Sequence, residues 1–75
     1  IKIFPIPAKK IIYIETKNEK IINFTLYNLI GKSMVQIDNI NNSFYKIDIS
    51  EQTVGIYFLI IQTNKLIITK KIIIN

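Results

Sequence analysis

The sequence predicts an all-β domain, a sandwich of about seven short antiparallel strands, on three observations. Isoleucine is the most frequent residue of a chain that is 49% hydrophobic, and stiff, β-branched side chains favour strands. Several segments alternate between apolar and polar residues, which is the period of a strand with one buried face. Turn-forming residues separate these segments at the short spacing that is typical of a sandwich.

The first two expected strands end at clear turn signals. Ile1–Phe4 is followed by Pro5 and Pro7, which cannot both lie in a central ladder because proline lacks a backbone N–H. Ile11–Thr16 ends at the polar turn Lys17–Glu19. Both strands are therefore expected to be short.

The third and fourth strands are expected to form a hairpin. Ile21–Leu29 is broken at Gly31, and Ser33–Asp38 pairs back on it, since glycine commonly marks such a turn. One face of the longer strand carries Ile22, Phe24 and Leu26, and the other carries Asn23, Thr25 and Tyr27. The apolar face is predicted to point into the core.

The fifth strand has the most regular alternation. Asn39–Ser43 is a polar loop, and Phe44–Ser50 follows it. Tyr45, Ile47 and Ile49 are expected to point inward while the residues between them face water.

The last two strands are the most hydrophobic. Gly55–Ile61 is a continuous apolar run, typical of a strand at the centre of a sheet or with both faces covered. Asn64 and Lys65 form a tight turn, after which Leu66–Ile74 is expected to return antiparallel to its predecessor.

Length and composition limit the classes of function. Seventy-five residues provide one thin core, so we expect a single domain over residues 1–75. The chain begins inside a strand without a signal peptide, which suggests the excised end of a longer protein. Cysteine and histidine are both absent, which excludes thiol nucleophiles, disulfides, imidazole bases and the usual zinc and haem ligands.

The charge does not favour a nucleic-acid partner. The net charge is +5, but every basic residue is lysine. Arginine is the side chain that binds phosphate or guanine in a bidentate manner, so its absence argues against nucleic-acid binding.

The longest apolar run, Ile56–Ile61, is far shorter than the roughly 20 residues of a transmembrane helix. No transmembrane segment is expected.

Two patterns that suggest chemistry have simpler interpretations. Gly31, Lys32 and Ser33 match the end of a phosphate-binding loop, but Leu26 stands where that pattern requires its first glycine. A hairpin turn is favoured instead.

The carboxylates are placed at outward positions or in turns, where they solubilise the chain, so no catalytic pair is assigned. They are Glu15, Glu19, Asp38, Asp48 and Glu51.

Aromatic side chains could form a stacking platform for sugars or bases. The residues considered are Tyr13, Phe24, Tyr27, Phe44, Tyr45, Tyr57 and Phe58. Because they fall at alternating strand positions, most are assigned to the core. One or two of Tyr13, Tyr27 and Phe58 are expected to remain exposed.

Four sequence motifs, in order and over essentially the whole chain, resemble those of a known family. They are "FPIPA" (residues 4–8), "LYNLIGKSMV" (26–35), "GIYFLIIQT" (55–63) and "TKKIII" (69–74). Together they are similar to the C-terminal sorting domain, type A, of the bacterial type IX secretion system. The matching positions are Pro5, Pro7, Ala8, Tyr27, Asn28, Gly31, Gly55, Tyr57, Leu59 and Thr69.

The chain departs from the family pattern at three places. Phe4 stands where the family has tyrosine, and Ile6 stands where it has asparagine. Asparagine in such a turn would bond its own backbone, so this contact is missing here. The family often closes on a basic residue, whereas this chain closes on Asn75.

The resemblance implies an immunoglobulin-like sandwich that serves as a delivery signal rather than an enzyme. Such domains lie at the C-terminus of exported proteins in Bacteroidetes-type bacteria. Their covalently attached upstream cargo crosses the periplasm and reaches the outer-membrane translocon. A sortase-like cysteine peptidase then removes the domain near its upstream boundary, close to Ile1 or before it, and anchors the cargo to lipopolysaccharide at the cell surface. No cofactor or metal is implied.

The final strand is the expected recognition element. An edge strand has unpaired backbone groups that can accept a partner strand. We expect the translocon to contact Lys70, Lys71, Ile72, Ile73 and Ile74. The alternative for the two lysines is that they only keep a sticky edge soluble.

Two other functions remain open from the sequence. One is a non-cleaved adhesive or carbohydrate-binding module on the same sandwich. The other is a purely structural domain that mediates interactions.

Overall fold

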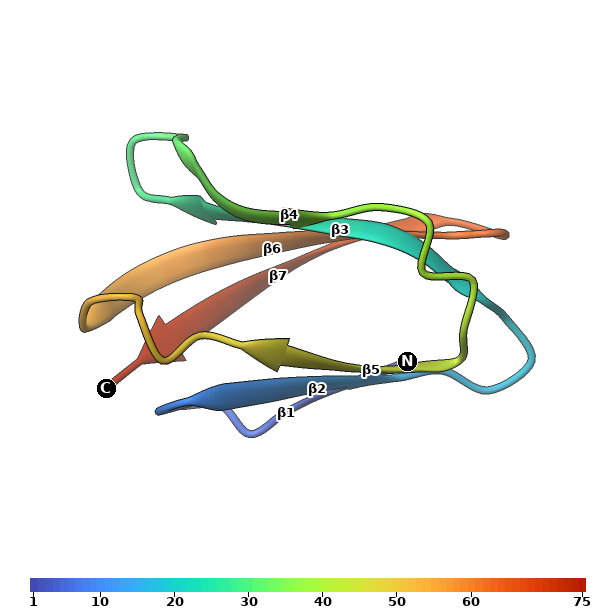
Figure 1. Cartoon of the computed structure of the whole chain (residues 1–75), viewed down its shortest axis with the longest axis horizontal. Helices are drawn as coiled ribbons and strands as arrows, with labels where there is room; N and C mark the ends of the chain where they lie inside the picture. Colours follow the sequence, from blue (N-terminus) through green and yellow to red (C-terminus); the bar gives the residue numbers. More distant parts are fainter.

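The computed structural model describes all residues, 1–75, as seven strands without a helix. Two sheets are stacked as layers (Figure 1). The strands are β1 (Lys2–Phe4), β2 (Ile11–Glu15), β3 (Ile21–Asn28), β4 (Ser33–Ile37), β5 (Phe44–Asp48), β6 (Gly55–Thr63) and β7 (Ile67–Ile74). The prediction of an all-β domain with seven strands is confirmed, and the architecture is consistent with an immunoglobulin-like sandwich.

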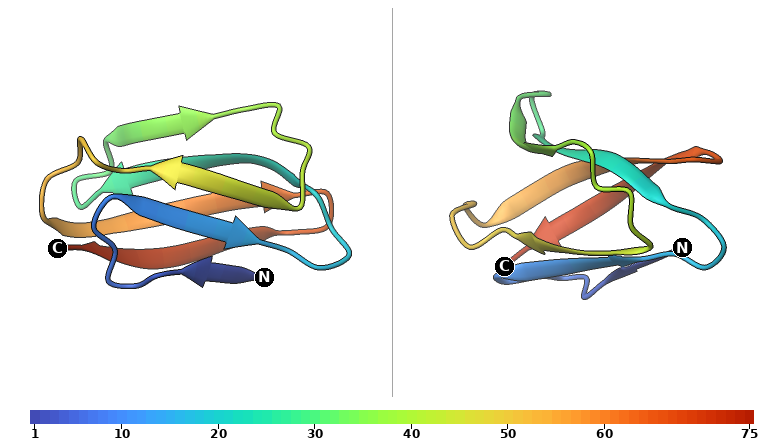
Figure 2. Two further views of the ribbon diagram at one scale, coloured as in Figure 1. Left: turned by 60° about the horizontal axis from the view of Figure 1, so that its bottom comes forward. Right: turned by 45° about the vertical axis from the view of Figure 1, so that its right-hand side comes forward.

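All strand pairs within the two sheets are antiparallel. One sheet has the order β1-β2-β5 and the other has the order β4-β3-β6-β7. The first and last strands, β1 and β7, are therefore edge strands of different sheets. Figure 2 shows them next to each other on one side of the sandwich.

The core lies between the two sheets and consists mostly of isoleucine. Its buried hydrophobic residues are Ala8, Ile12, Ile14, Ile21, Phe24, Leu26, Ile47, Ile49, Tyr57, Leu59, Ile61, Ile72 and Ile74. Burial of one such large side chain contributes roughly 1.5–3 kcal/mol relative to exposure. No cysteine is present to add a disulfide, so this packing carries the stability of the domain.

The predicted inward face of β3 is wrong at one residue. Phe24 and Leu26 are buried as expected, but Ile21 is buried in place of Ile22, which is half-buried. The register of β3 against β6 shifts between Ile21 and Asn23. Such a bulge inserts one extra residue, so the alternation changes phase there. In β5 no bulge intervenes, and Ile47 is buried while Tyr45 packs against the core; Ile49, just after the strand, is also buried as expected.

For the apolar run of β6, the sequence left two alternatives: a strand at the centre of a sheet, or a strand with both faces covered. The structure shows the first, because β6 lies between β3 and β7 and only one of its faces is covered. Tyr57, Leu59 and Ile61 point into the core, whereas Ile56 and Phe58 are 37% and 36% exposed. A two-layer sandwich covers only one face of each sheet, so the outer face of this apolar strand is open to solvent.

The assignment of most aromatic residues to the core is wrong. Of the seven considered, only Phe24 and Tyr57 are buried. On the outer face of the three-stranded sheet, Phe4, Tyr13 and Phe44 form an aromatic row. The ring centroids of Phe4 and Tyr13 are 5.5 Å apart, and those of Tyr13 and Phe44 are 5.7 Å apart. These rings pack on one another across the strands rather than in the core.

Candidate functional site

One end of β7 is held by a second segment besides β6. The backbone N–H of Ala8 donates to the carbonyl of Ile73 at 2.8 Å, and the N–H of Asn75 donates to the carbonyl of Ala8 at 2.9 Å. Ala8 and Ile74 thus form a parallel bridge, and both are buried. We call this contact the terminal bridge. It fixes the last residues of the chain in place.

The proline motif leads the chain from one sheet to the other. Pro5 and Pro7 lie between β1 and Ala8, and the Phe4–Pro5 and Ile6–Pro7 peptide bonds are both cis. β1 pairs with β2 in the three-stranded sheet, whereas Ala8 pairs with β7 in the four-stranded sheet. The first and last sequence motifs are therefore in direct contact.

The rest of β7 has a free backbone edge. Peptide groups of successive strand residues point to opposite sides. Ile73 and Asn75 bond to Ala8 on the side away from β6, and the carbonyl of Leu66 accepts from Thr63 on the β6 side. The peptide groups of Ile67, Thr69 and Lys71 consequently point away from β6, and none of them has a hydrogen-bond partner. We call these three peptide groups the free edge of β7.

The two lysines of β7 lie on opposite faces of the sheet. Lys70 is paired with Leu59, which is buried, and Lys71 is paired with Phe58, which is exposed. Lys70 therefore stands at a core-facing position, where the sandwich opens, and Lys71 stands on the outer face. Neither lysine forms a salt bridge in the structure.

The expected recognition residues do not form one surface patch. Ile72 is fully buried and Ile74 is 2% exposed, while Ile73 is 37% exposed. Of the five, only Lys70, Lys71 and Ile73 have exposed side chains. Ile72 and Ile74 hold the strand in the core.

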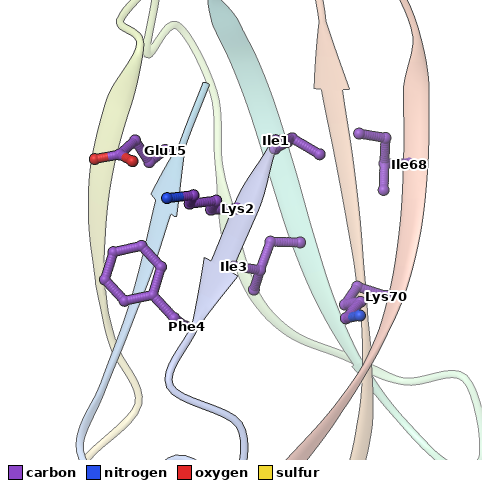
Figure 3. Close-up of a pocket in the computed structure, with 7 residues that line it drawn as sticks. All are labelled: Ile1, Lys2, Ile3, Phe4, Glu15, Ile68 and Lys70. Carbon is purple, nitrogen blue, oxygen red and sulfur yellow. The ribbon is translucent and has the colours of Figure 1, made fainter. Parts of the chain in front are cut away.

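A groove of about 630 Å³ lies between β1 and β7. In Figure 3, Ile1 and Ile3 point from β1 towards Ile68 and Lys70 on β7. Lys2, Phe4 and Glu15 line the other side of β1. The floor of the groove is thus apolar, with one lysine beside it. The sequence could have indicated this arrangement. Ile68, Lys70, Ile72 and Ile74 are alternate residues of one strand, so their side chains all point to the same face of the sheet.

The second motif is a hairpin turn, as predicted. The side-chain carbonyl oxygen of Asn28 accepts from the N–H groups of Ile30 and Lys32 at 3.1 and 2.9 Å. Gly31 has φ of 83°, a left-handed conformation that glycine adopts without a steric cost. Tyr27 is half-buried on the outer face and pairs with Phe58. Asn28 and Gly31 therefore act in turn formation, with no phosphate-binding loop.

The third motif anchors a loop and pairs with the last motif. The hydroxyl of Tyr57 donates to the carbonyl of Thr53 at 2.7 Å, and its ring is buried. This contact is similar to the tyrosine corner of immunoglobulin sandwiches. Along the strand pair, Gly55 faces Ile74, Tyr57 faces Ile72, Leu59 faces Lys70 and Ile60 faces Thr69.

The carboxylates are dispersed. No three of them gather as possible metal ligands, and four are exposed while Glu19 is half-buried. Hydrogen bonds from the hydroxyl and the N–H of Ser50, at 2.6 and 2.9 Å, hold the pKa of Asp48 below its ordinary value of 3.8. Their effect is confined to this turn.

Fold and site together define a small β-sandwich module built around its last strand. The family model of the secretion system C-terminal sorting domain matches residues 2–75, and the chain belongs to this family of type IX secretion signals. The family consists of sorting signals rather than enzymes. Searches of curated proteins and of solved structures found no match. No helix that could cross a membrane is present.

Proposed function

We propose that this domain directs an upstream cargo through the type IX outer-membrane translocon, and that the translocon reads the free edge of β7 together with the side chains of Lys70 and Lys71. Family membership supports the delivery role. The observation that supports β7 as the recognition site is the difference in hydrogen bonding between its two ends. The terminal bridge fixes the end of β7, while the peptide groups of Ile67, Thr69 and Lys71 stay unpaired. Unpaired edge groups are what a partner strand requires.

The later steps of delivery are part of the same proposal. The cargo crosses the periplasm, and after translocation a sortase-like cysteine peptidase cleaves near Ile1 and anchors the cargo at the cell surface. A cut close to Ile1 or before it falls ahead of β1 (Lys2–Phe4), so it would leave all seven strands intact.

The proposal is tested with a reporter fused to the domain and expressed in a bacterium with type IX secretion. Removal of residues 70–75 would also remove Ile72 and Ile74 from the core, so point variants are the better choice. In the Lys70→Glu, Lys71→Glu double variant we expect the reporter to remain in the periplasm, with circular dichroism showing a folded domain. Normal surface delivery of this folded variant would contradict the proposal.

A second candidate function is supported by the aromatic row. Phe4 and Phe44 are 39% and 43% exposed, on a face that also carries charged side chains of β2 and β5. Such a face suits a non-cleaved adhesive or carbohydrate-binding module. Glycan-array binding by the domain that is lost in Tyr13→Ala would favour this function. A mature protein whose mass lacks residues 1–75 would oppose it.

A further inference from the structure

We propose that the contact on β7 is made by an extended strand of the partner, which adds to the free edge of β7 and places a carboxylate against Lys70. This inference rests on the proposed function, because it names the kind of partner that the free edge receives. Three features of the structure carry it: the direction of the peptide groups, the shape of the groove, and the position of Lys70.

The peptide groups define where the added strand lies. Both backbone groups of Ile67, Thr69 and Lys71 are free, whereas the carbonyl of Ile73 already accepts from the N–H of Ala8. The terminal bridge therefore blocks the edge beyond Lys71. An added strand pairs with the stretch from Ile67 to Lys71, and this limits the contact to about five residues.

The groove defines the side chains of the added strand. Successive side chains of a strand point to opposite faces. On one face, the added residues enter the groove between Ile68 of β7 and Ile1 and Ile3 of β1. Apolar side chains fit these positions, and they would cover hydrophobic surface that is now accessible.

Lys70 defines the charge. It is the only ionisable residue that β7 places at the groove, and no carboxylate pairs with it. Glu15, which also lines the groove, lies on the other side of β1 with Lys2. A carboxylate on the added strand, opposite Lys70, would form an ion pair that is partly shielded from water. The partner strand is therefore apolar at its inward positions except for one acidic residue.

A second copy of the chain does not fit this site. Symmetric antiparallel pairing of two Ile67–Lys71 stretches would place Lys70 of each copy opposite Ile68 of the other and diagonal to its Lys70. It would leave Lys70 without a carboxylate, and each copy carries a net charge of +5. An acidic partner strand avoids the repulsion between two such copies.

The experiment uses the 75-residue chain and two synthetic peptides. The first alternates threonine with valine and has glutamate at the inward position that would lie opposite Lys70. The second has lysine in place of that glutamate. We expect the glutamate peptide to bind at least about tenfold more tightly than the lysine peptide, as measured by NMR titration. Lys70→Glu should reverse this preference, while Lys71→Glu, on the outer face, should keep it.

A backbone variant tests the strand pairing itself. Thr69→Pro removes one N–H of the free edge without removing a bond to β6, so peptide binding should be lost. Thr69→Ala is the matched control and should bind as the natural chain does. The inference is overturned if the glutamate peptide does not bind at about 1 mM, if both peptides bind equally, or if Thr69→Pro binds normally.

The peptide and the export measurements separate the two proposals. If the glutamate peptide binds as expected but Lys70→Glu, Lys71→Glu fusions are still displayed at the surface, the inference stands and the proposed function of the free edge is refuted. If export is lost in these fusions and no peptide binds, the partner is not an acidic strand, and the proposed function stands.

Discussion

The two ends of β7 differ in how they are held, although they belong to one strand of eight residues. The C-terminal end is paired on both sides, with β6 and with Ala8, and its inward side chains are buried. The other end is paired only with β6, and its inward side chains line an open groove. The difference shows that stability and accessibility are assigned to separate stretches of the same strand.

The motif residues explain how this division is built. Ala8, which follows the two prolines, supplies the terminal bridge, and Tyr57 and Asn28 fix the loops at the same end of the sandwich. In Figure 1 these loops and the C-terminus lie together at the left. Conversely, the free edge of β7 has no such support. The predictions below test this contrast, beginning with the largest expected effect.

Truncation of a buried residue at the held end should cost the most stability. We expect Ile72→Ala to lower the free energy of unfolding by about 2–4 kcal/mol, because it leaves a cavity in the core. Ile68→Ala, in the groove, should cost less than half of that, since Ile68 is only half-buried. Urea unfolding of both variants gives the comparison, and equal losses would contradict it.

Loss of the Tyr57 hydroxyl should have an intermediate effect. Tyr57→Phe removes the hydrogen bond to the Thr53 carbonyl but keeps the buried ring, so we expect a loss of about 1 kcal/mol. Thermal unfolding measures it. Tyr27→Phe is the matched control, because no hydrogen bond involves the Tyr27 hydroxyl, and it should leave the midpoint unchanged. If Tyr57→Phe were as stable as this control, the hydrogen bond of Tyr57 to Thr53 would not contribute to the stability of this end of the sandwich.

The lysines of β7 should hardly affect folding. Lys70→Gln and Lys71→Gln replace exposed side chains without salt bridges, so we expect changes within about 0.5 kcal/mol in urea unfolding. A larger loss in Lys70→Gln would indicate that this lysine supports the core opening rather than remaining available for a partner.

Asp48 should make the smallest contribution, and only its pH dependence should reveal it. Its pKa is lowered in the folded state, so the stabilisation is present above the unfolded pKa and is lost as the pH falls through the lower, folded value. Asp48→Asn should therefore flatten the acid side of the stability profile slightly. An unchanged profile below about pH 4 would contradict this.

Much of the fold could be predicted from the sequence, because most strands keep a regular alternation. Ile47 and Ile49 were placed correctly for this reason. Ile21 and Ile22 were not, because a bulge shifts the register of β3 against β6 between Ile21 and Asn23. This register depends on pairing with a distant segment and leaves no local pattern in the sequence.

The site was predictable only in part. The motifs indicated that the last strand takes part in recognition. Because neighbouring residues of a strand point to opposite faces, the sequence could also have placed Lys70 and Lys71 on different faces of the sheet. The terminal bridge could not be foreseen, since it joins Ala8 to residues at the opposite end of the chain. Without it, neither the burial of Ile74 nor the limit of the free edge at Lys71 can be derived.

The most direct test of the central claim, that the free edge of β7 delivers the cargo, is surface display of a reporter fused to the Thr69→Pro and Thr69→Ala variants. Both domains should be folded by circular dichroism, because the Thr69 N–H points away from β6. We expect the Thr69→Ala fusion to reach the cell surface and the Thr69→Pro fusion to stay in the periplasm. Equal surface display of the two fusions would contradict the claim.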